Sequence, residues 1–145
     1  MLHGKAPTLL LDFSRHQDPE SLSSTLNKVS YPGRTTNLAK ALKFATKKLF
    51  IKSSRPDAGK ALVIMTYSNP DEETKKVSKF LNKAGVTIYT VGLGCASNKM
   101  ALRHIGSLPT QSHEIYADSD TSLFSKVMNF RDQVCTGRNT VNLSL

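Results

Sequence analysis

The chain has 145 residues, a formal net charge of +9 and an apolar fraction of 39%. This length fits one globular domain, which would bury roughly two thirds of the surface that the unfolded chain exposes. No apolar run approaches the roughly 18 residues that a membrane-spanning helix needs, so we predict no membrane insertion.

Only two cysteines are present, Cys95 and Cys135, which excludes a framework of several disulfides. Cys95 follows a predicted strand at its carboxyl end, whereas Cys135 closes the last predicted helix, which should return toward the opposite end of the sheet. A strand of five or six residues covers about 17 to 20 Å, so the two sulfurs would lie too far apart to bond. We therefore predict that Cys135 has no partner within the chain.

The first part of the chain is predicted to form one strand and two helices. Leu9–Phe13 is a short apolar run typical of a buried strand. Asp18-Pro19-Glu20 supplies the cap, first-turn proline and acid of a helix start. Thr35-Thr36-Asn37 can cap a second helix. The apolar stripe of that second helix is Leu38, Leu42, Ala45 and Leu49.

The rest of the chain alternates strands with helices. The predicted strands are Ala61–Thr66, Val86–Val91 and His113–Ala117. Asn69–Glu73 opens a helix with a cap, a proline and acids. The predicted buried side of this helix consists of Val77, Phe80, Leu81 and Ala84. Gly92-Leu93-Gly94 indicates a turn, and a short helix near Met100 and a terminal helix from Leu123 complete the pattern.

Strands alternating with helices of about 10 to 15 residues predict an α/β fold, with a Rossmann-like, doubly wound, mostly parallel sheet and helices on both faces. Such a sheet binds ligands at the carboxyl ends of its strands. The strand Ala61–Thr66 is followed there by Tyr67, which cannot supply the negative charge that a hard cation needs. Tyr67 therefore indicates a binding scaffold without metal chemistry.

Catalytic patterns find little support in the sequence. The histidines are scattered without ligand spacing: His3, His16, His104 and His113. No serine stands in a nucleophile-elbow motif. A metal-dependent hydrolase, the enzymatic alternative, would need two or more convergent carboxylates, whereas the strand ends offer Asp12 with Asp118 or Asp120. We predict that the chain is not an enzyme.

Positive charge is concentrated in one segment, since Ser21 to Ser54 contains seven basic residues and no acid. The predicted basic patch is Lys40, Lys43, Lys47 and Lys48. A sulfated glycosaminoglycan would meet it as a row of cations, although lysines are also the default surface residues of helices. Nucleic acid is not expected, because Phe44 and Phe50 lie where the core stripe should be.

Six segments, taken in order, resemble a von Willebrand factor type A domain of the extracellular-matrix kind, similar to the collagen VI and matrilin domains. They are Tyr31-x-Gly33, Thr36 with Ala41-Leu42, Leu62–Thr66, Val86–Gly94, Leu102 to Pro109, and Ser122 to Cys135. The resemblance covers Leu9 to Cys135 and implies a single domain over residues 9–135. Residues 1–8 would be an amino-terminal extension and residues 136–145 a flexible tail. The resemblance also implies secretion into the extracellular matrix.

In that family a divalent cation is held by an Asp-x-Ser-x-Ser strand end, a threonine, and an aspartate in a Thr-Asp-Gly turn. Thr36 matches the threonine, but Tyr67 and Ser68 stand at the aspartate and glycine positions. Leu9–Ser14 resembles the second strand of the family, which would leave the motif-bearing first strand missing. Alternatively, Asp12–His16 is a degraded form of that motif. The resemblance thus implies a degenerate metal-ion-dependent adhesion site and no cofactor, with a divalent cation such as magnesium disfavoured by Tyr67 in the aspartate position.

These observations predict a non-enzymatic adhesion or protein-interaction module of a collagen VI-like matrix protein that needs no cation. Its partners would be matrix or cell-surface proteins. The expected ligand face consists of Thr36, Tyr67, Ser68 and Asn69. The alternative is a module that binds a polyanion, such as a sulfated glycosaminoglycan, through the lysine-rich helix.

Overall fold

The computed structural model describes residues 2–3, 6–11, 18–30, 37–51, 58–94 and 98–136. The chain forms two compact units, Met1–Ala58 and Gly59–Leu145. The second unit carries the parallel sheet and therefore most of the predicted ligand face.

The first unit begins with a short hairpin, in which β1 (Leu2–His3) pairs antiparallel with β2 (Pro7–Thr8). The strand predicted over Leu9–Phe13 is wrong for Leu9–Leu11, which are half-buried but form no strand. The ladder of the hairpin ends at Thr8. An apolar run becomes a strand only where a neighbouring strand offers its backbone groups, and sequence pattern alone cannot show that.

Three helical segments follow the hairpin. Asp18 caps α1 (Pro19–Asn27), and its carboxylate accepts a hydrogen bond from the Ser21 amide at 2.8 Å. The side chain of Asn37 caps α2 (Leu38–Ala45) by accepting from the Lys40 amide at 2.8 Å. The chain continues directly into a π-helical segment, η1 (Thr46–Ile51). The buried residues of α2 are Leu38, Ala39, Ala41, Leu42 and Ala45. The predicted apolar stripe is therefore confirmed for Leu38, Leu42 and Ala45, whereas its fourth member, Leu49, lies in η1 and is half-buried.

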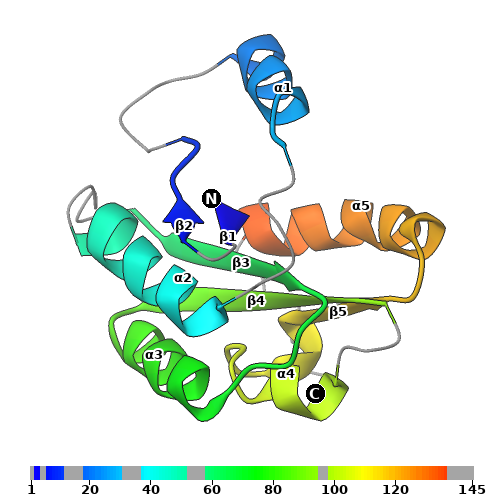
Figure 1. Cartoon of the computed structure of the whole chain (residues 1–145). Helices are drawn as coiled ribbons and strands as arrows, with labels where there is room; N and C mark the ends of the chain where they lie inside the picture. The colour runs from blue at the N-terminus through cyan, green and yellow to red at the C-terminus, as the bar shows by residue number, and fades with distance from the viewer. Residues whose placement is uncertain are drawn as a thin grey trace. The chain divides into compact units, whose positions relative to one another are not determined.

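The second unit is built on a parallel three-stranded sheet with the order β3-β4-β5 (Figure 1). Its strands are β3 (Lys60–Thr66), β4 (Val86–Leu93) and β5 (Glu114–Ala117). The register places Gly92 opposite Thr66 on one side and opposite Tyr116 on the other. Because all three strands run in the same direction, their carboxyl ends share one edge of the sheet.

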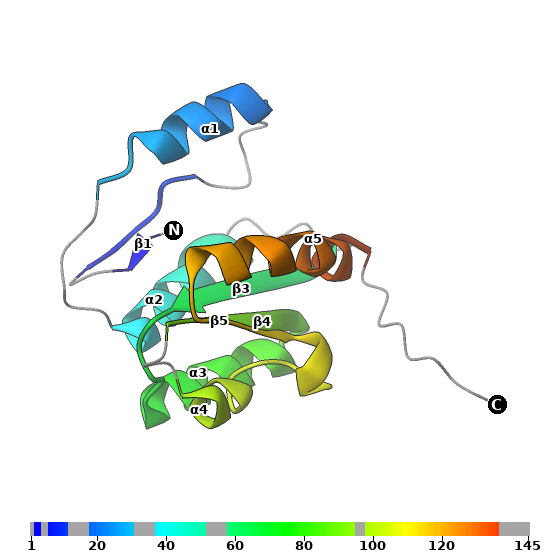
Figure 2. The same cartoon turned by 90° about the vertical axis from the view of Figure 1, so that its right-hand side faces the viewer.

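Helices cover both faces of this sheet, as Figures 1 and 2 show. One face carries α3 (Glu72–Lys83) and α4 (Lys99–Arg103), and the opposite face carries α5 (Asp120–Thr136). A short 3-10 turn, η2 (Thr110–Ser112), precedes β5. The predicted α/β class with a parallel sheet and helices on both faces is therefore confirmed.

The core of the second unit joins these layers. Ile64, Leu81, Ile88, Leu102 and Ile105 are all buried. Gly92 is needed at the centre, because a Cβ there would lie 2.8 Å from both the Leu102 and the Tyr116 side chains. On the α5 face, the Tyr89 ring meets the ring of Phe130 edge-on, with centroids 5.4 Å apart.

The structure moves three predicted features. The cap of α3 is Asp71, whose carboxylate accepts from the Thr74 amide at 2.7 Å and the Thr74 hydroxyl at 2.6 Å. Strand β4 continues through Gly92 and Leu93, where a turn was predicted, because both residues pair with β5. Phe80 and Ala84, both predicted to lie on the buried side of this helix, are exposed, Phe80 to 57%.

Cys135 is a free, exposed cysteine in the described part of the chain, whereas Cys95 lies outside the described residues. Within the described part of the chain, no helix combines the length and the apolar character that crossing a membrane requires.

Candidate functional site at the carboxyl ends of the strands

Three loops lie at the carboxyl edge of the parallel sheet, since β3 ends at Thr66, β4 at Leu93 and β5 at Ala117. This is the edge at which open α/β sheets bind their ligands. The structure places the sequence-predicted residues Tyr67, Ser68 and Asn69 in the loop after β3. The fourth predicted residue, Thr36, lies outside the described residues.

Thr66 and Ser68 fix the beginning of the loop that follows β3. The amide of Ser68 donates to the Thr66 hydroxyl at 3.0 Å, and the two hydroxyl oxygens lie 2.9 Å apart. Thr66 itself is only 3% exposed. A buried hydroxyl thus anchors the turn, and Tyr67 between these residues is directed outward.

Tyr67 is the most exposed large side chain of this loop, with 64% of its surface accessible. Its ring rests beside Gly94, where an added Cβ would lie 3.4 Å from the ring. Gly94 has a φ of 70°, a conformation that residues with a Cβ rarely adopt. The glycine after β4 therefore lets the loop pass close to the Tyr67 ring. The rest of the Tyr67 ring surface stays accessible to a partner.

Asn69 ties the first loop to the second, because its side-chain oxygen accepts a hydrogen bond from the Asn98 amide at 2.8 Å. Asn98 also caps α4 through the Ala101 amide at 3.3 Å. The predicted ligand residue Asn69 is thus engaged in holding two loops together. Gly94 and Asn98 were not foreseen as parts of this edge, and only the glycine pattern after β4 could have indicated them.

The side chains below this edge hold α4 against β5. The Tyr116 hydroxyl donates to the Lys99 carbonyl at 2.8 Å, and the Lys99 ammonium lies 5.2 Å from the ring centroid. Burial, helped by the negative charge of Glu114, raises the pKa of Tyr116 to about 12. Arg103 makes a forked hydrogen-bonded pair with Glu114, at 2.8 and 3.0 Å. The groups that support this edge are therefore the neutral phenol of Tyr116 and the ion pair between Arg103 and Glu114.

Asp118 is the carboxylate that directly follows β5, and it is exposed. The Ser122 hydroxyl holds the pKa of this carboxyl below its usual range, with smaller contributions from the Ser119 hydroxyl and the Lys126 charge. Asp118 is therefore ionised at neutral pH. The loop after β3, on the other side of β4, carries the phenol of Tyr67 at the equivalent place.

A magnesium-like cation prefers several carboxylate or carbonyl oxygens, whereas the described part of this edge carries Tyr67 and Ser68 after β3 and Asp118 after β5. Among the described residues, no group of three or more His, Cys, Asp or Glu side chains could hold a metal ion. The residues Asp12, Ser14 and Thr36, which the family pattern would involve, lie outside the described residues. Cation independence therefore stays a prediction from Tyr67 and Ser68.

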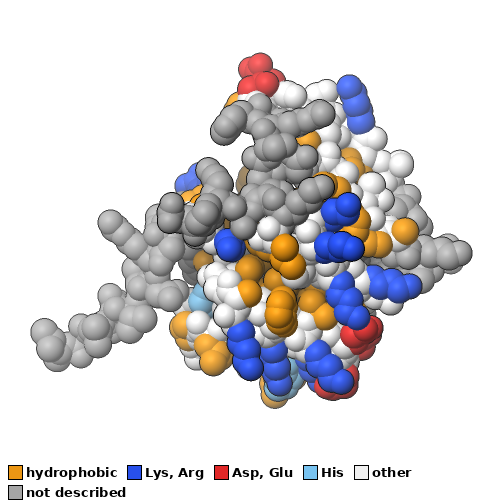
Figure 3. Space-filling model, turned by 90° about the vertical axis from the view of Figure 1, so that its left-hand side faces the viewer, with side chains coloured by type: hydrophobic (Ala, Val, Ile, Leu, Met, Phe, Trp, Pro, Cys, Tyr) orange, Lys and Arg blue, Asp and Glu red, His pale blue; other side chains and the backbone are white. Residues whose placement is uncertain are grey.

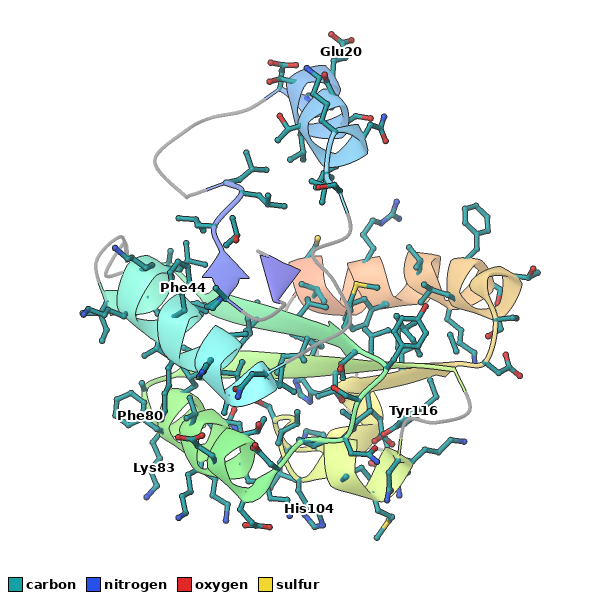
Figure 4. The ribbon with its side chains drawn as sticks, viewed as in Figure 1. Glu20, Phe44, Phe80, Lys83, His104 and Tyr116 are labelled. Carbon is teal, nitrogen blue, oxygen red and sulfur yellow. The ribbon has the colours of Figure 1, made fainter. Side chains whose placement is uncertain are left out.

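The predicted basic patch lies in the other unit. All its lysines are exposed, Lys40 and Lys43 on α2 and Lys47 and Lys48 on η1. Phe44 is half-buried and Phe50 buried, so these rings are not interleaved with the cations as a stacking platform (Figure 4). The exposed apolar side chain beside these lysines is Ile51 of η1, at 69%.

Comparison with known proteins identifies the class of this fold and site. Residues 1–130 match the von Willebrand factor type A domain, so the chain belongs to that family. The match confirms the resemblance that the sequence indicated.

The individual relatives are extracellular-matrix proteins. The chain is 26% identical over 127 residues to the human collagen alpha-1(XXI) chain, covering 88% of this chain and 13% of that protein. It is 26% identical over 137 residues to human matrilin-1, covering 90% of this chain and 27% of that protein. The chain thus spans a small part of these relatives. Because these relatives are extracellular-matrix proteins, the chain is assigned to the extracellular space as well.

A solved structure shows the same fold. Proximal thread matrix protein 1 from the mussel byssus superimposes with a TM-score of 0.81 at 19% identity, covering 92% of this chain and 35% of that chain. That protein has also been solved with zinc in its metal-ion-dependent adhesion site.

Proposed function

We propose that this chain is a non-enzymatic adhesion module that binds a matrix or cell-surface protein through the carboxyl edge of its sheet without a cation. The observation that carries the proposal is Tyr67, which is 64% exposed on that edge. Exposed tyrosines supply large contact area together with a polar end, which is why they are enriched at protein interfaces.

The anchoring of the loop supports this function. Ser68 and Asn69 hold the Tyr67 loop to the buried Thr66 hydroxyl and to the start of α4. A partner that covers Tyr67 would therefore pay little ordering entropy at this position. Position 67 carries a phenol and no carboxylate. This favours recognition of a partner through contact area and hydrogen bonds over recognition through a bridging metal ion.

The test is retention of the purified chain on surfaces coated with collagen fibrils or matrilin, first in EDTA and then in millimolar magnesium. We expect equal retention in both, and a loss of about tenfold for Tyr67→Ser, the effect of removing an interface anchor. Phe124→Ser is the matched control, because Phe124 is a 78% exposed aromatic residue of α5.

Two results would contradict the proposal. Retention that requires magnesium would show that the chain uses a cation, and the thermal midpoint should then rise when magnesium replaces EDTA. Equal losses in Tyr67→Ser and Phe124→Ser would show that the carboxyl edge has no special role.

The second candidate is polyanion binding through Lys40, Lys43, Lys47 and Lys48, whose side chains are all exposed. Binding of this kind depends on counterion release and falls steeply with added salt. A heparin column distinguishes the two functions. If the lysine patch binds a polyanion, the double variant with Lys40→Glu and Lys47→Glu should elute from this column at clearly lower salt than the unchanged chain.

A further inference from the structure

Helix α3 presents a second surface that the carboxyl edge does not include. This α3 surface consists of Lys76, Lys79, Phe80 and Lys83. All four residues are exposed. Figure 4 shows Phe80 and Lys83 projecting from the helix, and Figure 3 shows basic side chains around hydrophobic ones on one face of the molecule.

Positive charge on α3 is only partly compensated. Glu72 pairs with Lys75 at 2.5 Å, and the Asp71 carboxylate is used to cap the helix. Lys76, Lys79 and Lys83 form no ion pair within the described part of the chain. The ion pair of this helix therefore lies in its first turn, and the lysines beyond that turn carry positive charge without a paired carboxylate among the described residues.

Phe80 lies between two of these cations. Lys76 precedes it by four residues and Lys83 follows it by three, so both are its neighbours on the helix surface. The ring is 57% exposed, although Leu81 beside it is 1% exposed. Because the Phe80 ring is mostly in water, it adds little hydrophobic stabilisation to this fold. It offers an apolar anchor to a partner instead.

A groove of about 640 Å³ adjoins the α3 surface at the amino-terminal side of β4, between α3 and the segment that follows α4. Lys79 and Asn82 line it from α3, and His104, Ser107 and Leu108 line it from the other side. Leu108 is 82% exposed. The groove thus continues the mixture of positive charge and apolar surface found around Phe80.

Fixed polar groups form part of the groove wall. The Ser107 hydroxyl accepts from the Ile88 amide at 2.8 Å and donates to the Asn82 side-chain oxygen at 2.5 Å. His113, only 4% exposed, uses Nδ1 to donate to the Pro109 carbonyl at 2.8 Å. The His113 ring also packs against the Tyr89 ring, with centroids 4.8 Å apart.

We propose that the α3 surface and this groove bind an acidic peptide segment of a protein partner that carries aliphatic or aromatic side chains. Its carboxylates would meet Lys76, Lys79 and Lys83, while its apolar side chains cover Phe80 and Leu108. Charge complementarity steers such a segment and sets its register, and the buried apolar contacts supply most of the affinity. This surface is separate from the Tyr67 edge, so the inference does not depend on the proposed function.

Phe80 and Leu108 decide between a peptide and a sulfated polysaccharide. A polysaccharide could pair with the lysines, but it has no aliphatic or aromatic groups to cover two exposed apolar side chains. The basic patch of the first unit provides the contrast within the same chain, because Phe44 there is half-buried, Phe50 is buried, and the exposed apolar side chain beside the lysines is the aliphatic Ile51.

The test measures binding of a short synthetic peptide of alternating glutamate and leucine to the whole chain by fluorescence anisotropy. A second peptide with serine in place of leucine carries the same charge. We expect Phe80→Ser to weaken binding of the leucine peptide about tenfold, and Lys79→Glu with Lys83→Glu to weaken it by at least as much. The control variants are Lys40→Glu with Lys47→Glu, which match the charge change, and Phe124→Ser, which matches the aromatic change.

The expected pattern is specific. The control variants should stay within about twofold of the unchanged chain, since they leave the residues of the α3 surface and of the groove unaltered. Equal binding of the two peptides, no effect of Phe80→Ser, equal losses in the control variants, or no binding of the leucine peptide would each overturn the proposal. Because Phe80 is exposed, its variant should keep the thermal midpoint of the unchanged chain, which verifies that it folds.

Discussion

Helices α2 and α3 are both lysine-rich and amphipathic, but they differ in what they leave exposed. In α2 the apolar stripe is buried, with Leu42 at 1% and Ala45 at 0% exposure. In α3, Leu81 is equally buried, whereas Phe80 next to it is 57% exposed. The lysines of α2 therefore form a polar face, while those of α3 surround an apolar side chain. Similar lysine spacing can thus belong to a solvated face or to a binding surface.

The largest effect that would test this comparison is expected in the buried stripes. Leu42→Ala in α2 and Leu81→Ala in α3 should each lower the free energy of unfolding by about 3 kcal/mol, because each leaves a cavity in a packed core. Urea denaturation followed by circular dichroism measures both. An effect near zero for either variant would show that its stripe is not packed as described.

The helix caps should give an intermediate effect that differs between the two helices. Asn37→Ala and Asp71→Ala should each cost about 1 kcal/mol, the usual contribution of a capping side chain. Asp71 should be the larger of the two, because its carboxylate accepts from both the amide and the hydroxyl of Thr74. Chemical denaturation of Asp71→Asn, which keeps a cap acceptor, is the matched control and should recover much of the loss.

A small effect is expected for Phe80→Ala, within about 0.5 kcal/mol of the unchanged chain, because substitutions of exposed side chains alter stability little. Its contrast with Leu81→Ala, one residue away, tests directly which α3 side chain belongs to the core. A loss as large as that of Leu81→Ala would place Phe80 in the core and remove it from the α3 surface.

The smallest effect concerns pH. The Lys75 ammonium, through its hydrogen bond and charge, holds the pKa of Glu72 below its usual value. A lowered pKa in the folded state gives stability that is present above the pKa of the unfolded chain and is lost as pH falls through the folded value. The fall of the thermal midpoint at acidic pH should therefore be slightly smaller in Glu72→Gln than in the unchanged chain. Helix α2 has no acidic residue in its first turn, so we expect no corresponding pH dependence of the thermal midpoint from that turn.

The sequence predicted the order of elements in the second unit and hence the position of Tyr67 after a strand. Strong signals did this, namely apolar runs for β3 and β4, and cap, proline and acids for α3. It failed for Leu9–Leu11 because a strand needs a neighbour that local pattern does not reveal. The link between Asn69 and Asn98, and the approach of Gly94 to Tyr67, were missed because they join loops that are distant in sequence.

By itself, the sequence determined the alternating α/β pattern, the excess of positive charge and the position of Tyr67 after a strand, which follow from local composition and periodicity. The order of six short segments along the chain indicated the family. Only the tertiary structure decided that Phe80 is exposed while Leu81 is buried, and that the lysines around Phe80 lie beside a groove. Both apolar residues fit the same helical stripe, and the packing of α3 on β4 selects which one the sheet covers.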